Sequence, residues 1–129
     1  MEFEMHEDPN PYTPIDENRR RPLTLAQLAD ANRRRAVEWN PAGTPLGLEF
    51  AMVELAGEVG EACNALKKII RHKHGLKGGD PDTSALANEL GDAQICLSLV
   101  ANAAGIDLGE ATRAKFNKTS EKHGFSTRL

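Results

Sequence analysis

A chain of 129 residues is long enough for one domain with a modest core and leaves little room for a second. Sixteen Lys and Arg against nineteen Asp and Glu give a net charge of −3, so neither sign indicates a general binder of nucleic acid or of anionic membranes. We therefore expect one domain plus a tail, with partners that are set by local sites.

The first residues differ in composition from the rest. Residues 1–22 contain four prolines and almost no periodic apolar signal, which predicts an extended N-terminal arm before a domain over residues 23–129. Such an arm can become ordered against a neighbouring subunit. The acidic start is unlike a signal peptide, and the longest nearly apolar run, "AQICLSLVANAAG", is too short to cross a bilayer. These features predict a cytoplasmic protein.

The first half of the domain predicts two helices. A capping-box pattern that begins at Thr24 precedes apolar residues at helical spacing, which continue toward Trp39. The segment "NPAGTP" then breaks the chain. Thr44 can cap a second helix over about 46–71, with Pro45 in its first turn, and "KGGDPD" ends it.

The second half predicts two more helices. Asp82 or Ser84 can start a long amphipathic helix whose apolar residues recur at intervals of three and four up to Gly105. The words "DLGE" repeat the capping pattern, and a last helix runs to about His123, with Gly124 as its stop. With no strand signal and short connections, the chain is predicted to be an all-α four-helix bundle.

Cysteine and histidine do not predict a metal site. Cys63 and Cys96 lie inside helical apolar patterns, where reduced cysteine behaves as a small hydrophobe, and both are predicted to be core residues. The four histidines form no HxxxH or HExxH pattern. We assign these residues no chemistry.

Acidic residues gather on one face of the second predicted helix. In "VELAGEVGEACNALKK", Glu54, Glu58 and Glu61 are spaced by four and then three residues, so their carboxylates project from one side. In the third helix, "NELGD" places Glu89 and Asp92 three residues apart. Carboxylates are hard ligands suited to Mg²⁺, or to Mn²⁺ as a substitute. Facing pairs from two antiparallel helices would form such a site.

A single ExxE pair is most often a solvated helix face, because charged residues are mostly exposed. The glycines beside these acids are less ordinary. Gly57, Gly60 and Gly91 each cost about 1 kcal/mol inside a helix unless close packing or an approaching ligand needs the space. The combination of acids and glycines therefore indicates a site.

The chain resembles the MazG-like all-α nucleoside triphosphate pyrophosphohydrolases, whose signature is ExxE followed by ExxD. Glu58, Glu61, Glu89 and Asp92 match this signature. The resemblance covers about residues 25–129, including "EVGEACNALKK", "ELGDAQICLSLVANAAGIDL" and "KFNKTSEKHGF", and it is greatest for short phage and actinobacterial members. Many members have two adjacent acids before "xGE". The earlier of these positions is a glycine here, which leaves Glu54, one turn before Glu58, to take over its role.

The resemblance implies hydrolysis of a nucleoside triphosphate between the α and β phosphates, with Mg²⁺ held by the four matching acids. The metal would neutralise the triphosphate and lower the pKa of a bound water. Glu54 or Glu61 could accept the proton of that water, and the two alternatives stay open. The expected catalytic residues are Glu54, Glu58 and Glu61.

Groups for the rest of the nucleotide are predicted around the acids. Lysine and arginine supply charge for phosphate and asparagine supplies a donor, although each is individually more often a solvated surface residue. The candidates for phosphate binding are Lys67, Arg71, Lys115, Asn117 and Lys118, with Lys115 and Asn117 favoured because they match the family word "KFNK". Trp39 either plugs the bundle end or stacks on a base, whose edge Asn40 could then read.

The resemblance also implies a homodimer, or a dimer of dimers forming a homotetramer, with the site near a subunit interface. The substrate could be dUTP, dCTP or a damaged nucleotide in a house-cleaning role. It could also be dGTP, converted to dGMP for 2-aminoadenine DNA synthesis, as in the phage relatives called MazZ. A non-catalytic helical interaction module is the alternative from a different functional class.

Overall fold

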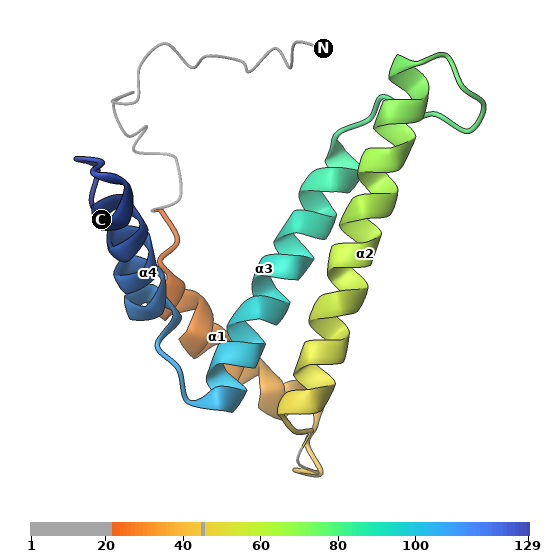
Figure 1. Cartoon of the computed structure of the whole chain (residues 1–129). Helices are drawn as coiled ribbons and strands as arrows, with labels where there is room; N and C mark the ends of the chain where they lie inside the picture. Colours follow the sequence, from red (N-terminus) through yellow and green to blue (C-terminus); the bar gives the residue numbers. More distant parts are fainter. Residues whose placement is uncertain (1–21, 45) are drawn as a thin grey trace.

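The computed structural model describes residues 22–44 and 46–129, and within these ranges it is built of α-helices without a strand (Figure 1). The helices are α1 (Leu25–Trp39), α2 (Leu48–Lys73), α3 (Ser84–Ala104) and α4 (Leu108–His123). The prediction of four helices and an all-α fold is confirmed. The predicted arm lies outside the described residues, apart from its last residue, Pro22.

Local capping signals set most helix ends. At the start of α1, Thr24 and Gln27 form a reciprocal capping box, with N···O distances of 3.1 and 2.9 Å. The side chain of Asp107 accepts from the backbone N–H of Glu110 at 3.0 Å and caps α4. Gly105 and Gly124 end α3 and α4 in the left-handed conformation, each with φ of +68°, which glycine adopts without steric cost. These ends are where the sequence predicts them.

The start of α2 differs from the prediction. The helix begins at Leu48, its N-cap is Gly47, and no side chain caps it. Thr44 lies three residues before this N-cap, too far along the chain to cap the helix, and its carbonyl accepts a hydrogen bond from the Asn40 side chain. Position 45 lies outside the described residues.

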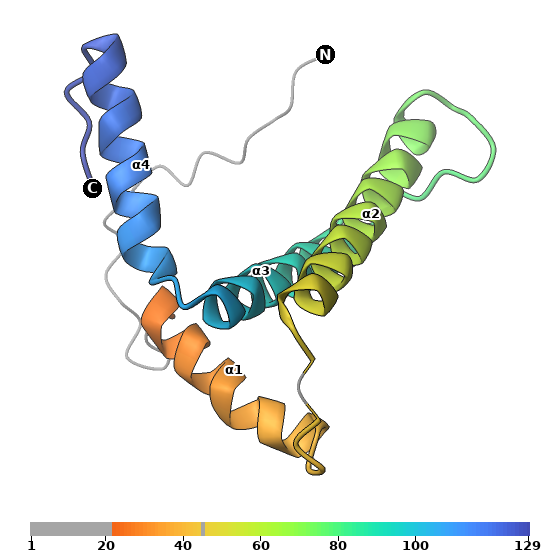
Figure 2. The same ribbon diagram turned by 60° about the horizontal axis from the view of Figure 1, so that its bottom comes forward.

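The helices are arranged as a hairpin with two attachments. α2 and α3 pack side by side as an antiparallel pair, α1 crosses α3, and α4 contacts α1 more lightly (Figures 1 and 2). In both views α4 stands apart from α2, with α3 between them. The α2–α3 hairpin is therefore the part of the fold that can bring residues of two helices together over a long contact.

Asparagine side chains join α1 to α3. Asn32, which is only 3% exposed, donates from Nδ2 to the carbonyl of Ile95 at 3.2 Å. In the opposite direction, Asn102 donates from Nδ2 to the carbonyl of Ala29 at 3.0 Å. Because a buried amide without a partner is costly, these two contacts fix where α1 crosses α3.

The core of the single chain is thin. The buried apolar residues among those described are Leu28, Ala51, Ala65, Cys96 and Ala101. Cys96 is buried as predicted, but the core assignment of Cys63 is wrong because its side chain is exposed. α2 packs mainly on α3. Side chains of α2 that do not face α3, such as Cys63, therefore stay exposed.

Candidate metal centre

Three acids from the α2–α3 hairpin converge. Glu58 comes from α2, and Glu89 and Asp92 come from α3. One carboxylate oxygen from each lies within 4.8 Å of the other two. Glu58 and Glu89 are half-buried and Asp92 is exposed, so the cluster is partly covered by the protein and open to solvent on the side of Asp92.

The register of the hairpin explains why these acids meet. Glu58 lies seven residues from both Ala51 and Ala65, the two buried alanines of α2, so it projects from the face that packs on α3. On α3, Glu89 lies seven residues before the buried Cys96 and shares its face. Alanine at the contact allows the two helix axes to approach closely. Small residues thus bring the acids of both helices within reach of one ion.

The cluster concentrates negative charge. Partial burial, followed by the charges of Asp92 and Glu89, raises the pKa of Glu58 above its ordinary value of 4.5. Glu61 and Glu54 add smaller contributions of the same sign. Carboxylates this close repel one another unless a proton or a cation lies between them. A divalent cation would relieve this repulsion.

The donor set fits Mg²⁺ or Mn²⁺. In octahedral coordination the ligand oxygens lie about 3 to 4 Å apart, so small side-chain rotations would place three oxygens around one ion. The open side leaves positions for water and for phosphate oxygens. Burial, together with Glu54 and Glu58, raises the pKa of the Cys96 thiol.

Comparison with known proteins identifies the family of the chain. The MazG nucleotide pyrophosphohydrolase domain family matches residues 47–125, which include α2, α3 and α4. The chain belongs to this family. It is also similar to the Gene 37 protein of Mycobacterium phage L5, with 33% identity over 76 residues, which is 59% of this chain and 66% of that protein. The chain thus spans slightly less than two thirds of that relative, and no solved structure gives a significant match.

The other two predicted acids of the MazG site lie beside the cluster. Glu54 and Glu61 are exposed on α2, one turn before and one turn after Glu58. Both contribute to the raised pKa of Glu58, but neither carboxylate belongs to the group of three. The assignment of Glu61 as a fourth ligand stays a prediction.

The glycines beside the acids were expected to provide clearance. At Gly57, Gly60 and Gly91 an added Cβ would meet no atom within 4 Å. Packing within one MazG chain therefore does not require glycine at these positions. Any close approach that they serve comes from outside the chain.

The predicted phosphate-binding residues lie away from the cluster within one chain. Lys67 and Arg71 are nine and thirteen residues beyond Glu58, or about 14 and 20 Å along the helix axis. The candidates Lys115, Asn117 and Lys118 are on α4, which stands apart from α2 (Figures 1 and 2). The side chain of Asn117 exchanges hydrogen bonds of 2.9 and 3.2 Å with the backbone of Leu129, a clamp on the C-terminal tail that the sequence does not reveal.

The predicted base-binding pair lies at the end of α1. Trp39 is 81% exposed, so it does not plug the bundle within one chain, and its ring is open to a stacking partner. The Asn40 side chain donates to the carbonyl of Thr44. The use of both residues for a base stays a prediction.

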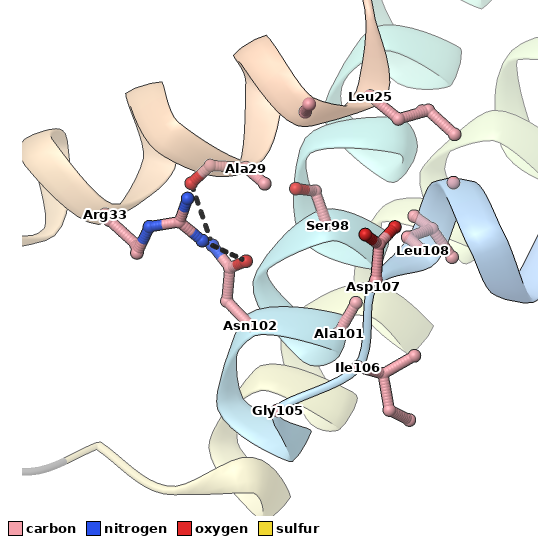
Figure 3. A pocket seen from close by; sticks show the side chains of 12 residues that line it. Leu25, Ala29, Arg33, Ser98, Ala101, Asn102, Gly105, Ile106, Asp107 and Leu108 are labelled. Carbon is pink, nitrogen blue, oxygen red and sulfur yellow. Dashed lines mark hydrogen bonds between the residues drawn. The ribbon is translucent and has the colours of Figure 1, made fainter.

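A separate cavity of about 310 Å³ lies where α1, α3 and α4 meet (Figure 3). In its wall, Arg33 donates from Nη1 to Asn102 Oδ1 at 3.2 Å, and Asp107 lies on the opposite side. Ala101, which lines it, is nine residues after Asp92 and therefore half a turn away around α3. The cavity opens on a different face of α3 from the acids. Two polar residues inside the apolar run of α3, Ser98 and Asn102, were sequence signals for it.

No helix in the described part of the chain is both long enough and apolar enough to cross a membrane.

Proposed function

We propose that this MazG-family chain hydrolyses a nucleoside or deoxynucleoside triphosphate between the α and β phosphates, releasing a nucleoside monophosphate and pyrophosphate. The observation that carries the proposal is the convergence of Glu58, Glu89 and Asp92 within 4.8 Å, inside the region that matches the family. A solvated acidic face of a single helix would not bring carboxylates of two helices together.

In the proposed mechanism, Glu58, Glu89 and Asp92 hold Mg²⁺, with Mn²⁺ as a substitute. When bound, the metal supplies positive charge for the triphosphate and lowers the pKa of the attacking water. Glu54 or Glu61, exposed beside the cluster, accepts the proton of that water. The water oxygen bonds to the α phosphorus as the bond from that phosphorus to the α–β bridging oxygen breaks, and pyrophosphate leaves with the bridging oxygen.

The proposal includes an assembly of at least two copies. Lys115 and Lys118 carry charges suited to the triphosphate, but α4 of the same chain stands apart from the acids. A homodimer or homotetramer would allow α4 of one copy to approach the hairpin of another. Large apolar side chains of α2 and α3 that stay exposed in the single chain, such as Phe50 and Leu90, support such contacts.

For the substrate we favour dGTP, converted to dGMP in phage synthesis of DNA containing 2-aminoadenine. The similarity to a mycobacteriophage protein supports a phage setting. House-cleaning hydrolysis of dUTP, dCTP or damaged nucleotides uses the same acids and differs only in the base pocket.

A nucleotide panel tests both the reaction and the substrate. The protein is incubated with each common dNTP and NTP at equal concentration with Mg²⁺ or Mn²⁺, and nucleoside monophosphate and pyrophosphate are measured. We expect pyrophosphate release, fastest with dGTP. Release of single phosphates would overturn the assigned bond. The absence of both metal binding and turnover would instead favour a helical interaction module.

Substitution of the ligands gives the first mutational prediction. We expect Glu58→Gln and Asp92→Asn each to lower kcat by at least about a hundredfold, because each removes a negatively charged ligand. Circular dichroism should show unchanged helix content. The matched control is Glu49→Gln, which changes an exposed acid in the first turn of α2, outside the cluster, and should leave turnover within about twofold. Loss of folding in both variants would indicate a structural role for the acids.

A further inference from the structure

α4 carries an apolar groove that no other helix of residues 22–44 and 46–129 fills. Its lining residues recur at intervals of three and four along the helix, and Phe125 closes one end: Leu108, Ala111, Thr112, Lys115, Phe116, Thr119, Ser120 and Phe125. The groove has a volume of about 680 Å³, and Phe116 and Phe125 remain 41% and 59% exposed. A continuous stripe of this kind usually marks a surface that is covered in the working molecule.

The start of the domain lies at one end of this groove. Leu25 and Ala26, the first residues of α1, line the cavity at the helix junction together with Leu108 and Gly109 (Figure 3). Leu108 is also the first residue of the groove on α4. The chain that precedes Leu25 therefore enters the described structure next to the groove.

The residues before α1 have the reach to cover it. The stripe from Leu108 to Ser120 spans twelve residues of helix, or about 18 Å. Nine residues separate Ile15 from Thr24, and an extended segment of that length reaches about 30 Å. Tyr12 and Ile15 can thus reach any point along the groove of the same chain.

The composition of the two segments is complementary. Residues 1–17 contain apolar side chains that could fill the groove, namely Phe3, Met5, Tyr12 and Ile15, and also six acids with no Lys or Arg. Residues 108–129 contain five Lys and Arg against two Glu, and Lys115 lies in the groove itself. Apolar burial and charge attraction both favour their association.

We propose that the N-terminal segment, residues 1–17, docks onto the α4 groove of its own chain, with Tyr12 and Ile15 against Phe116 and with acidic residues near Lys115. The docked segment buries the apolar stripe and ties the start of the chain to its last helix. The groove lies on α4, away from the acidic cluster of the same chain. Docking engages Lys115, so Lys118, which does not line the groove, is then the candidate lysine of α4 left for the triphosphate of another copy. The inference holds whether or not the chain hydrolyses nucleotides.

Photo-crosslinking of the full chain tests the contact. The photo-reactive amino acid p-benzoylphenylalanine is installed at Phe116, unlabelled and heavy-nitrogen-labelled proteins are mixed in denaturant and refolded together, and crosslinked peptides are identified by mass spectrometry. We expect a crosslink to residues 1–17 with both peptides from the same isotopic pool. The control places the same group at Val37, which is 69% exposed on α1. Peptide pairs of mixed label would show docking onto a second copy and overturn the proposal, as would crosslinks to another segment or yields no higher than the control.

A charge substitution gives an independent test. Thr119→Glu places a carboxylate in the groove, where it would repel an acidic segment, whereas Ala114→Glu places the same charge on an exposed position of α4 outside the groove. We expect chymotrypsin to cleave after Tyr12 at least about fivefold faster in the Thr119 variant, with no change in the Ala114 variant. Equal cleavage rates in both variants and in the unmodified protein would overturn the docking. Circular dichroism checks that both variants keep their helices.

Discussion

At Glu58, burial and the neighbouring carboxylates both disfavour the charged form of the side chain. It is half-buried between α2 and α3, and every charge that acts on its pKa is another carboxylate. In the metal-free protein, protonation of Glu58 is the simplest relief available. A side chain that destabilises the metal-free fold but would bind a cation is typical of a site whose ligands are held in place before the metal arrives.

The raised pKa predicts how metal-free stability depends on pH. Because the folded-state pKa of Glu58 lies above its unfolded value, the stabilisation from its protonated form is complete below about pH 4.5 and is lost as pH rises through the raised value. In EDTA, the melting temperature should therefore fall between weakly acidic and neutral pH. Glu58→Gln should reduce this fall and melt higher than the unmodified protein at neutral pH.

The control for this prediction is Glu49→Gln, which removes one acid of α2 outside the cluster and should keep the pH dependence. Addition of Mg²⁺ should raise the melting temperature of the unmodified protein more than that of Glu58→Gln. If the melting temperatures of Glu58→Gln and Glu49→Gln depend on pH in the same way, the repulsion among the carboxylates does not act mainly through Glu58.

At the scale of helices, local signals in the sequence predict what local chemistry decides. The capping box at Thr24 and the left-handed glycines at positions 105 and 124 are short-range features, and the structure contains them. The start of α2 was mispredicted because Thr44 is a favoured capping residue by type, whereas the observed N-cap is Gly47, three residues further on, which has no capping side chain. Capping preference alone cannot decide between two start positions so close together.

In the candidate site too, the sequence predicts features within one helix but not the relation between helices. Spacing predicts that the acids of one helix share a face, and the structure brings together Glu58, Glu89 and Asp92. Spacing does not predict the offset between two helices, so the position of Glu61 beside the group of three, and not within it, could not be predicted. The position of α4 depends on tertiary and quaternary contacts, so the sequence does not predict that α4, which carries Lys115, stands apart from α2 of its own chain (Figures 1 and 2).

The attachment of α1 to α3 depends on Asn32, which is almost fully buried and donates to the carbonyl of Ile95. We expect Asn32→Ala to lower the free energy of unfolding by about 1 to 3 kcal/mol, because it removes a buried hydrogen bond and leaves a small void. Urea denaturation should show a lower midpoint with an unchanged slope.

The matched control is Asn88→Ala on the exposed surface of α3, which should be neutral or slightly stabilising because alanine favours the helix. If both variants unfold at the same urea concentration, the α1–α3 crossing does not depend on this hydrogen bond.

Across the whole molecule, one chain buries less apolar surface than its helices offer. Large side chains along α2 and α3 remain at least 38% exposed, among them Leu48, Phe50, Met52, Val53, Val59, Ile70, Leu90 and Leu97. Several of these recur at intervals of four and seven, which places them in stripes along their helices. A hairpin with such stripes forms a complete bundle when it pairs with another hairpin.

The pairing of hairpins is tested by Met52→Lys. Met52 is 49% exposed in the single chain, and lysine is a good helix former, so the substitution should leave an isolated chain folded. In a paired hairpin the same lysine would place a charge in an apolar contact, which is costly without a partner. We therefore expect the unmodified protein to sediment as a dimer or a tetramer and the Met52 variant to sediment at a lower mass.

Val37→Lys is the control, because Val37 is 69% exposed on α1, away from the hairpin stripes, and its substitution should leave the mass unchanged. If all three proteins sediment at the mass of one chain, the stripes are not a contact between copies, and Lys115 and Lys118 of another copy cannot complete the acidic site.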